Sequence, residues 1–217
     1  MIVDLHTHST LSDGVLIPAE SVRRAVIAGY SGIVITDHAD FSNFSHILES
    51  VHNFKNKNNT CEDGIKILAG VELTHVRPCH IAELTASARA QNADLVLVHG
   101  ESLAEPVEEG TNRAAIDAGV DILAHPGLIS YEDALLAAKN GVYLELTTRK
   151  GHSLTNGHVA KMALSVGAKL VICNDFHAPG DYVEENKVLR ILEGAGLSSN
   201  EALLVLENNI QLFKSKL

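Results

Sequence analysis

Histidine and carboxylate residues follow the apolar segments of this sequence in a regular way. The chain has 217 residues and 12 histidines, a high count for its length. Each of seven short apolar runs has His, Asp or Glu within two residues of its end. In chain order these polar residues are His6 and His8, Asp37 and His38, Glu72, His99, His125, Glu145, and Asp175 and His177. One such residue would mean little, but the recurrence at all seven runs indicates a single shared site.

The residue types in this set are those of a metal site. His6-x-His8 and Asp175-x-His177 each place two side chains on one side of extended backbone, because side chains alternate with period two. Imidazoles mixed with carboxylates suit zinc, manganese or iron rather than calcium or magnesium. The candidate ligands exceed the four that one tetrahedral ion takes, and they suit two or three divalent ions. They are His6, His8, Asp13, His38, Glu72, His99, His125, Asp175 and His177.

A site with several metal ions favours hydrolysis of a phosphate ester. Such ions lower the pKa of bound water and neutralise charge on phosphoryl oxygens. A carboxylate can bridge two ions, and Glu72 is the best candidate because it lies between the ligands of neighbouring runs. Arg149 could clamp a phosphate with parallel hydrogen bonds, although a surface arginine in a loop fits the sequence equally well. We assign catalytic roles to Glu72, His177 and Arg149, and substrate contacts to Arg149, Lys150 and His152.

The elements that must position these residues alternate strictly. The apolar runs are as short as strands buried on both faces of a parallel sheet. They cover residues 2–5, 33–36, 66–71, 95–98, 122–124, 142–146 and 170–173. Amphipathic stretches predict helices over 18–28, 45–57, 81–91, 111–118, 132–139, 157–166 and 182–193, and a capping box at Ser198–Glu201 opens a last helix.

This βα alternation predicts a parallel α/β sheet with right-handed crossovers, either closed into a barrel or left open. No GxGxxG motif follows the first run and no GxxxxGK[ST] motif occurs, so nucleotide-binding open sheets lose support. Sites in parallel α/β folds assemble at the carboxyl ends of the strands. The polar residues listed above should therefore converge there.

Bulk properties narrow the class of protein. The formal net charge of −10 disfavours a nucleic-acid partner, although bound ions would invert the local sign and admit an anionic metabolite. The first residues lack the pattern of a signal peptide, and no apolar stretch approaches the ~20 residues of a membrane span. We expect one domain over 1–217, a cytoplasmic location, a small phosphorylated metabolite as substrate, no membrane partner, and possible homo-oligomers.

The ordered motifs resemble those of the polymerase and histidinol phosphatase (PHP) superfamily. The resemblance runs from His6 to His177, about four-fifths of the chain. Its pieces are His6-x-His8 with Ser12-Asp13-Gly14, Thr36-Asp37-His38, Gly70-Val71-Glu72, His99, Ala124-His125-Pro126-Gly127 and Asp175-x-His177. Segments 70–75 and 149–153 look like a stand-alone, histidinol-phosphatase-like branch. The resemblance implies a distorted seven-stranded (β/α)7 TIM-like barrel with its active site at the carboxyl ends of the strands.

The resemblance also implies a trinuclear centre and phosphomonoesterase activity, with a metal-bridging hydroxide attacking phosphorus. When the ligands of the family are transferred to the matching positions of this sequence, one ion is bound by His6, His8, Glu72 and Asp175. Glu72 then joins His99 and His125 on a second ion, and a third takes Asp13, His38 and His177. The substrate does not carry over, because the chain is shorter than the classical histidinol phosphatases.

Two other functions compete with this hypothesis. An amidohydrolase-like C–N bond hydrolase also opens with His-x-His on a barrel, but it typically has eight strands and often a bridging modified lysine. Here seven runs are present, and no lysine ends the third or fourth. A metal-binding regulatory module without turnover is the other alternative, against which the near-complete ligand set argues.

Overall fold

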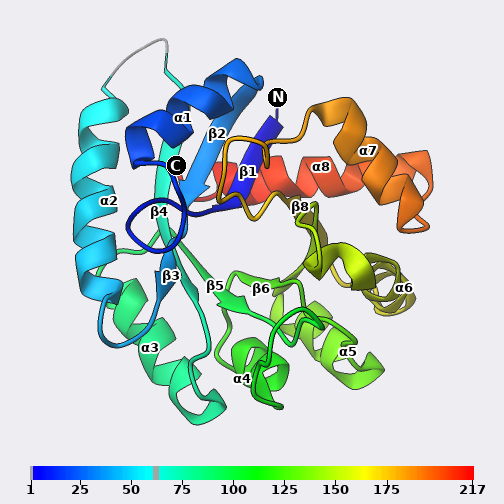
Figure 1. Ribbon diagram of the computed structural model, residues 1–217. Helices are drawn as coiled ribbons and strands as arrows, with labels where there is room; N and C mark the ends of the chain where they lie inside the picture. The colour runs from blue at the N-terminus through cyan, green and yellow to red at the C-terminus, as the bar shows by residue number, and fades with distance from the viewer. Residues whose placement is uncertain (1, 61–63) are drawn as a thin grey trace.

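Parallel strands form the centre of the computed structural model, which describes residues 2–60 and 64–217. Their order in the sheet is their order in the chain (Figure 1). The strands are β1 (Ile2–Thr7), β2 (Tyr30–Ile35), β4 (Lys66–Leu73), β5 (Leu95–His99), β6 (Ile122–Ala124), β7 (Tyr143–Thr147) and β8 (Leu170–Cys173). The short β3 (His38–Ala39) pairs with β4 beyond the end of β2, and this pairing sets His38 opposite Glu72.

Helices surround these strands (Figure 1). They are α1 (Pro18–Ile27), α2 (Phe44–Asn58), α3 (Pro78–Ala90), α4 (Thr111–Asp117), α5 (Tyr131–Asn140), α6 (Asn156–Val166), α7 (Glu185–Gly194) and α8 (Ser199–Lys214), with a 3₁₀ turn η1 (His152–Thr155) before α6. Helix α3 begins three residues before the predicted start, because Pro78 occupies the first turn, where its missing N–H costs nothing. Ser198 and Glu201 form the predicted capping box of α8.

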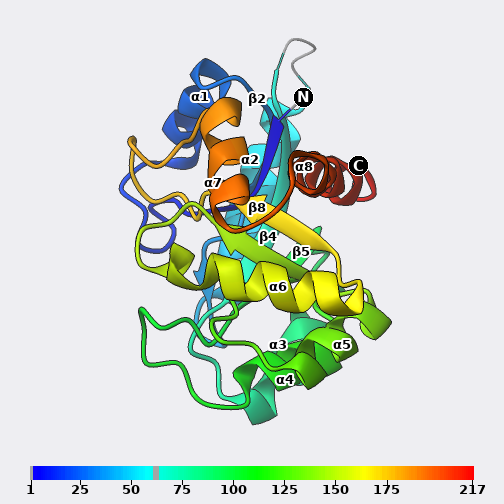
Figure 2. The ribbon, with the colours of Figure 1, turned by 90° about the vertical axis from the view of Figure 1, so that its right-hand side faces the viewer.

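Strands β1 and β8 meet only at their carboxyl ends. There the amide of His8 donates to the carbonyl of Phe176 at 2.8 Å, and Thr7 bridges to Phe176 in the parallel sense. At the opposite end α8 lies beside both strands, and Figure 2 shows it end-on. The Asn209 amide group donates to the carbonyls of Ile172 (2.6 Å) and Val3 (3.4 Å), and its oxygen accepts from the Ile172 amide at 3.0 Å. The Asn209 side chain thus takes the place of backbone hydrogen bonds between β1 and β8. The expected distorted seven-stranded TIM-like barrel is confirmed.

The interior of the barrel is an apolar layer closed at the bottom by α8. Inward side chains from all seven long strands pack with Leu212 and Phe213 of α8. Gly32 is required here, since a Cβ at this position would lie 2.6 Å from the Phe213 ring. A second, larger core fills the space between the strands and the surrounding helices. The polar site can therefore form only above the apolar layer, at the carboxyl ends of the strands.

A bulge in β1 changes which side chains face the interior. Between Asp4 and Thr7, β1 advances three residues while β2 advances two, from Ile33 to Ile35. Leu5 packs in the apolar interior, and the adjacent His6 lies beside Glu72 and Glu145 in the layer above. An extra residue of this kind breaks the alternation of a strand and redirects one side chain. The bulge thus adds a ligand to the layer above the core.

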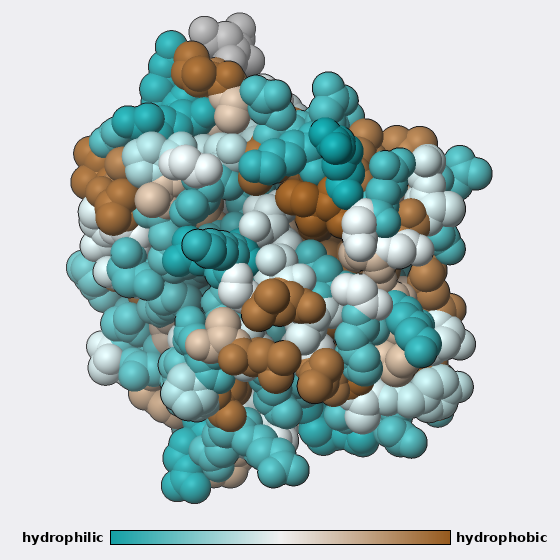
Figure 3. All heavy atoms as spheres, turned by 45° about the vertical axis from the view of Figure 1, so that its right-hand side comes forward, coloured by the Kyte–Doolittle hydropathy of each residue, from teal (hydrophilic) through white to brown (hydrophobic). Residues whose placement is uncertain are grey.

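Among the helices of residues 2–60 and 64–217, none has the length and apolar character that a bilayer span requires. On the face drawn in Figure 3, apolar side chains lie in several separate patches among hydrophilic ones.

We expect the Asn209→Ala variant to lower the free energy of unfolding by roughly 2–4 kcal/mol, because it leaves the buried Ile172 amide and carbonyl without partners. Urea unfolding followed by circular dichroism measures the change. Glu207→Ala, an exposed position on the same helix, is the control and should change stability by less than about 0.5 kcal/mol. Equal stabilities of the two variants would contradict the role assigned to Asn209.

Candidate metal centre

The candidate ligands continue the inward faces of the strands beyond the apolar layer. On β4 the inward series ends at Glu72, on β5 at His99 and on β7 at Glu145, each two or four residues past an inward apolar side chain. Because side chains alternate along a strand, these residues meet above the core. Side chains from the strand ends, the loop after β1 and η1 form three neighbouring groups of candidate ligands, and His6 and His125 form a fourth, overlapping group with Glu145.

The first group contains His6, His8 and Glu72, with Asp175 beside the two histidines, and all four residues are at least nine-tenths buried. His6 Nε2 lies 3.4 Å from Glu72 Oε1, and His8 Nε2 lies 3.3 Å from Asp175 Oδ1. Nevertheless His6 Nε2, His8 Nε2 and Glu72 Oε1 have no hydrogen-bond partner among the described residues. Buried polar atoms in proteins rarely lack a hydrogen-bond partner. Lone pairs that face one another in this way fit a cation between them.

The second group contains His99, His125 and His152. His125 Nε2 also lies 3.6 Å from Glu72 Oε1, so Glu72 faces the first and second groups together. His152, predicted from the sequence as a substrate contact, lies within this group of candidate ligands. Glu105, from the loop after β5, approaches His99 and His152 at 3.3 and 3.5 Å.

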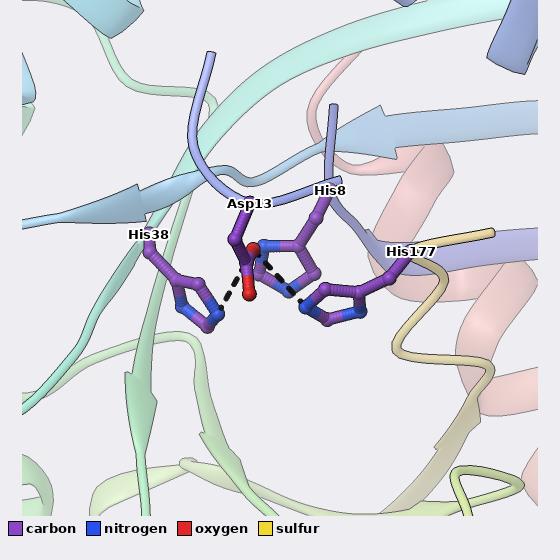
Figure 4. A group of neighbouring side chains, drawn as sticks. All are labelled: His8, Asp13, His38 and His177. Carbon is purple, nitrogen blue, oxygen red and sulfur yellow. Dashed lines mark ion pairs between the residues drawn. The ribbon is translucent and has the colours of Figure 1, made fainter. Parts of the chain in front are cut away.

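The third group contains His8, Asp13, His38 and His177, whose side chains point toward one another in Figure 4. Asp13 Oδ1 lies 3.4 Å from His38 Nε2 and 3.2 Å from His177 Nε2. Asp13 is on the loop after β1 and is the most exposed member. Gly14 lets this loop fold back, since a Cβ there would lie 2.7 Å from the backbone of His8.

Asp37, which lies within one of the sequence motifs, shapes this loop. Its carboxylate accepts hydrogen bonds from the Ser9 amide, the Ser9 hydroxyl and the Ser12 hydroxyl, all at 2.7 Å. Asp37 therefore holds the segment that carries Asp13 and is not itself among the grouped ligands.

In several histidines, Nδ1 contacts a carboxylate or carbonyl oxygen of the protein. These contacts orient the ring so that Nε2 points toward the other candidate ligands. His6 Nδ1 contacts Glu145 at 3.0 Å, His99 Nδ1 the carbonyl of Gly100 at 3.0 Å, and His177 Nδ1 the carbonyl of Asp175 at 2.9 Å. A proton on Nδ1 leaves the lone pair on Nε2, which is the tautomer that binds a metal.

Glu145 is the residue that the list of ligands omitted, although its place at a strand end was visible in the sequence. Its Oε1 faces His6 Nδ1, and its Oε2 accepts from the His125 amide at 3.0 Å. Burial raises the pKa of Glu145, while His6 acts in the opposite direction. With both oxygens engaged, Glu145 orients two ligands. Glu105, in contrast, lies in a loop and no sequence signal indicated it.

Backbone strain accompanies two of the ligands. His125 has φ of 26° and Asp175 has φ of 50°, in the left-handed region that residues with a Cβ rarely adopt. Such conformations cost about 1–3 kcal/mol each and persist where the surrounding structure dictates them. The strain turns both side chains toward Glu72 and the histidines at the point where the strands end.

Mutual electrostatics keep the two central carboxylates charged and shift the pKa values of the histidines in both directions. Burial opposes the charge on Glu72, but the facing His6 and His38 hold its pKa well below the ordinary value. The pKa of Asp175 is likewise lowered by His6 and His8 despite burial. Burial together with the neighbouring His38 lowers the pKa of His8 to about 3. Against the effect of burial, the facing carboxylates raise the pKa of His6 and His38, so these two imidazoles hold a proton more tightly than His8 does. Metal ions bound at these nitrogens would displace that proton, because imidazole binds a metal in its neutral form.

Arg149 and Lys150 differ in their relation to these groups. Arg149 Nε lies 3.8 Å from Asp175 Oδ2, and its Nη1 donates to Asp181 at 3.1 Å, so the side chain lies at the rim of the site. Lys150 is exposed, and no hydrogen bond or ion pair joins it to the groups within the described ranges.

We expect the protein, purified without chelators, to contain more than one equivalent of transition metal by elemental analysis. Removal of the metal with EDTA should lower the unfolding temperature, because ions that bind only the native state stabilise it by about 4 kcal/mol at a thousand times Kd. Absence of metal together with unfolding that EDTA does not alter would contradict the metal centre.

Glu145→Gln should weaken metal binding about 10- to 100-fold, because His6 loses the carboxylate that orients it and raises its basicity. Competition with a chromogenic chelator measures the affinity. The matched control is Glu49→Gln, an exposed position on α2, which should bind metal as the wild type does. An unchanged affinity in Glu145→Gln would show that Glu145 does not orient a ligand.

Comparisons of the sequence with known proteins agree on one family. A family model for the PHP domain matches residues 4–164. An uncharacterised protein of Methanocaldococcus jannaschii is 44% identical over 218 residues, which cover 100% of this chain and 98% of that protein. A probable phosphatase of Thermoanaerobacter sp. is 28% identical, with 100% and 94% covered. The ribonuclease P protein component 3 of Methanosarcina acetivorans is also 28% identical, with 81% and 73% covered.

Solved structures share the fold at low sequence identity. A chain of archaeal ribonuclease P with mature tRNA superposes with a TM-score of 0.73 at 18% identity, with 98% of this chain and 90% of that chain covered. Histidinol phosphate phosphatase from Lactococcus lactis subsp. lactis, complexed with zinc, L-histidinol and phosphate, gives 0.65 at 18% identity, with 91% and 94% covered. These similarities to ribonuclease P proteins mean that net charge alone does not exclude a nucleic-acid partner. The match of the family model over most of the sequence establishes that the chain belongs to the PHP domain family.

Proposed function

We propose that this protein is a metal-dependent phosphomonoesterase that acts on a small phosphorylated metabolite. The observation that carries the proposal is the convergence of three side-chain groups, in the first of which the buried His6 Nε2, His8 Nε2 and Glu72 Oε1 face one another without hydrogen-bond partners among the described residues. The proposed ligands of two or three zinc, manganese or iron ions are His6, His8, Asp13, His38, Glu72, His99, His125, Asp175 and His177.

The carboxylates of Glu72 and Asp175 each face histidines of two neighbouring groups. Divalent ions, when bound, supply Lewis-acid chemistry that activates water and neutralises phosphoryl oxygens. Glu72 directs Oε1 toward His6 and His125, and Oε2 toward His8. The two oxygens of Asp175 also face different histidines, with Oδ1 toward His8 and Oδ2 toward His125. Each carboxylate can therefore serve two neighbouring positions, as the bridging role proposed for Glu72 requires.

The solvent-facing side of the site fits an anionic substrate. Asp13 and His38 are the more exposed members of the third group, and Arg149 lies beside Asp175 at the rim. We assign Arg149 to the substrate phosphate, because a guanidinium presents several donors in one plane. Lys150, exposed on the next residue, is assigned a weaker contact with the rest of the substrate. Three ions would add about +6 at this point, enough to attract a phosphate despite the acidic chain.

A second candidate function is binding of structured RNA. Relatives named ribonuclease P protein component 3, and the superposition on archaeal ribonuclease P, favour it. The formal net charge of −10 opposes it, because contact with a phosphate backbone needs a basic surface. Filter binding of tRNA at several salt concentrations separates the two functions, since contacts with RNA phosphates weaken steeply as salt rises.

A panel of substrates assayed with zinc, manganese and iron tests the first proposal. We expect phosphomonoesters to turn over, and His8→Ala to lower kcat/KM about a thousandfold or more by removing a ligand shared by two groups. The variant should keep its fold, because His8 Nδ1 and Nε2 make no hydrogen bond within the described chain. Circular dichroism and thermal unfolding check this point.

His46→Ala, an exposed histidine on α2, is the matched control and should retain wild-type activity. Turnover of amides with no turnover of phosphomonoesters, phosphodiesters or cyclic phosphates would favour the amidohydrolase-like alternative. Metal binding without turnover of any ester or amide, together with salt-sensitive tRNA binding, would favour the RNA-binding candidate. A single domain over 1–217, a cytoplasmic location and possible homo-oligomers remain predictions.

A further inference from the structure

His152 belongs to the second group by its orientation as well as by its position. Its ring stacks on that of His125, with 4.2 Å between centroids and an interplanar angle of 20°. Its Nδ1 lies 2.6 Å from Ser102 Oγ, which also accepts from the Ala104 amide at 3.2 Å. With Nδ1 donating to Ser102, the lone pair lies on Nε2, which faces His99 and His125.

Glu105 contacts the same nitrogen atoms that would donate to a metal. Its Oε2 lies 3.3 Å from His99 Nε2, and its Oε1 lies 3.5 Å from His152 Nε2. Oε2 also lies 3.1 Å from His75 Nε2 at the edge of the group. The carboxylate thus spans two of the three histidines. A cation near His99 and His152 would find their imidazoles and the Glu105 carboxylate, with His125 and Glu72 on the other side. Zinc takes four ligands and can expand to five.

The loop that carries Glu105 is fixed at its base and open at its tip. Glu101 Oε1 accepts from the amides of Gly110 (3.0 Å) and Asn112 (2.9 Å), so one side chain joins both ends of the loop to the start of α4. Between these ends Glu105 remains two-fifths exposed, whereas His99 and His152 are buried. The loop therefore keeps Glu105 within reach of the second group, while solvent still reaches its carboxylate.

We propose that Glu105 is a loop-borne ligand of a metal position formed by His99, His125 and His152. This inference rests on the proposed function and adds two ligands to the set that the family resemblance implies. Glu105 is the member of this set that a loop carries and that solvent reaches. Glu72, with Oε1 toward both His6 and His125, connects this position to the first group.

Zinc binding at buffered free concentrations, measured by equilibrium dialysis and elemental analysis, tests the inference without any substrate. In Glu105→Gln and in His152→Gln we expect one ion per chain to bind at least about tenfold more weakly, while the other ions keep their affinity. Glu109→Gln has the same change of charge in the same loop, at an exposed position, and should match the wild type. Cobalt-loaded protein gives a second readout, since loss of one ligand alters its visible absorption spectrum.

The two proposals fail in different ways. A wild-type protein that binds no zinc or cobalt would overturn the proposed function and this inference with it. A wild-type protein that binds several ions and hydrolyses phosphomonoesters, with Glu105→Gln equal to Glu109→Gln in affinity and spectrum, would overturn this inference alone.

Discussion

Burial of carboxylates and imidazoles in one layer above an apolar core is the constraint on which the rest of the structure depends. Glu72 and Asp175 are charged and inaccessible to water, and their oxygens face histidine nitrogens rather than hydrogen-bond donors of the backbone. An isolated buried charge would be very costly, so the layer is stable only as a mutually compensating set. The strained backbone at His125 and the carboxylate of Glu145 serve this set by turning ligands inward.

Much of this layer could be predicted from the sequence because strands follow a simple geometric rule. Glu72 and His99 lie an even number of residues beyond inward apolar side chains, so their convergence follows from alternation and parallel order. The seven apolar runs and the alternation of strands and helices predicted the barrel for the same reason. The helix ends were less accurate, as Pro78 illustrates.

What the sequence did not indicate depends on local departures from that rule and on contacts across the fold. The bulge in β1 and the positive φ of Asp175 have no recognisable sequence pattern, although the motifs around them suggested ligands. Glu105 lies in a loop whose path is set by hydrogen bonds to Glu101, far from any periodic segment. The pairing of Asn209 with Ile172 and Val3 joins residues that only the finished barrel brings together.

The position of α8 has a consequence for the order in which the protein folds. Val3 and Asn209 are separated by 206 residues, so their contact is among the least local in the molecule. Loop closure over such a distance is entropically costly, and non-local contacts slow folding. During synthesis β1 is made early, and its edge that faces β8 stays unpaired until β8 and α8 have also been made. The layer of histidines and carboxylates that β1 and the segment after β8 carry would therefore become rigid only after most of the chain has been synthesised.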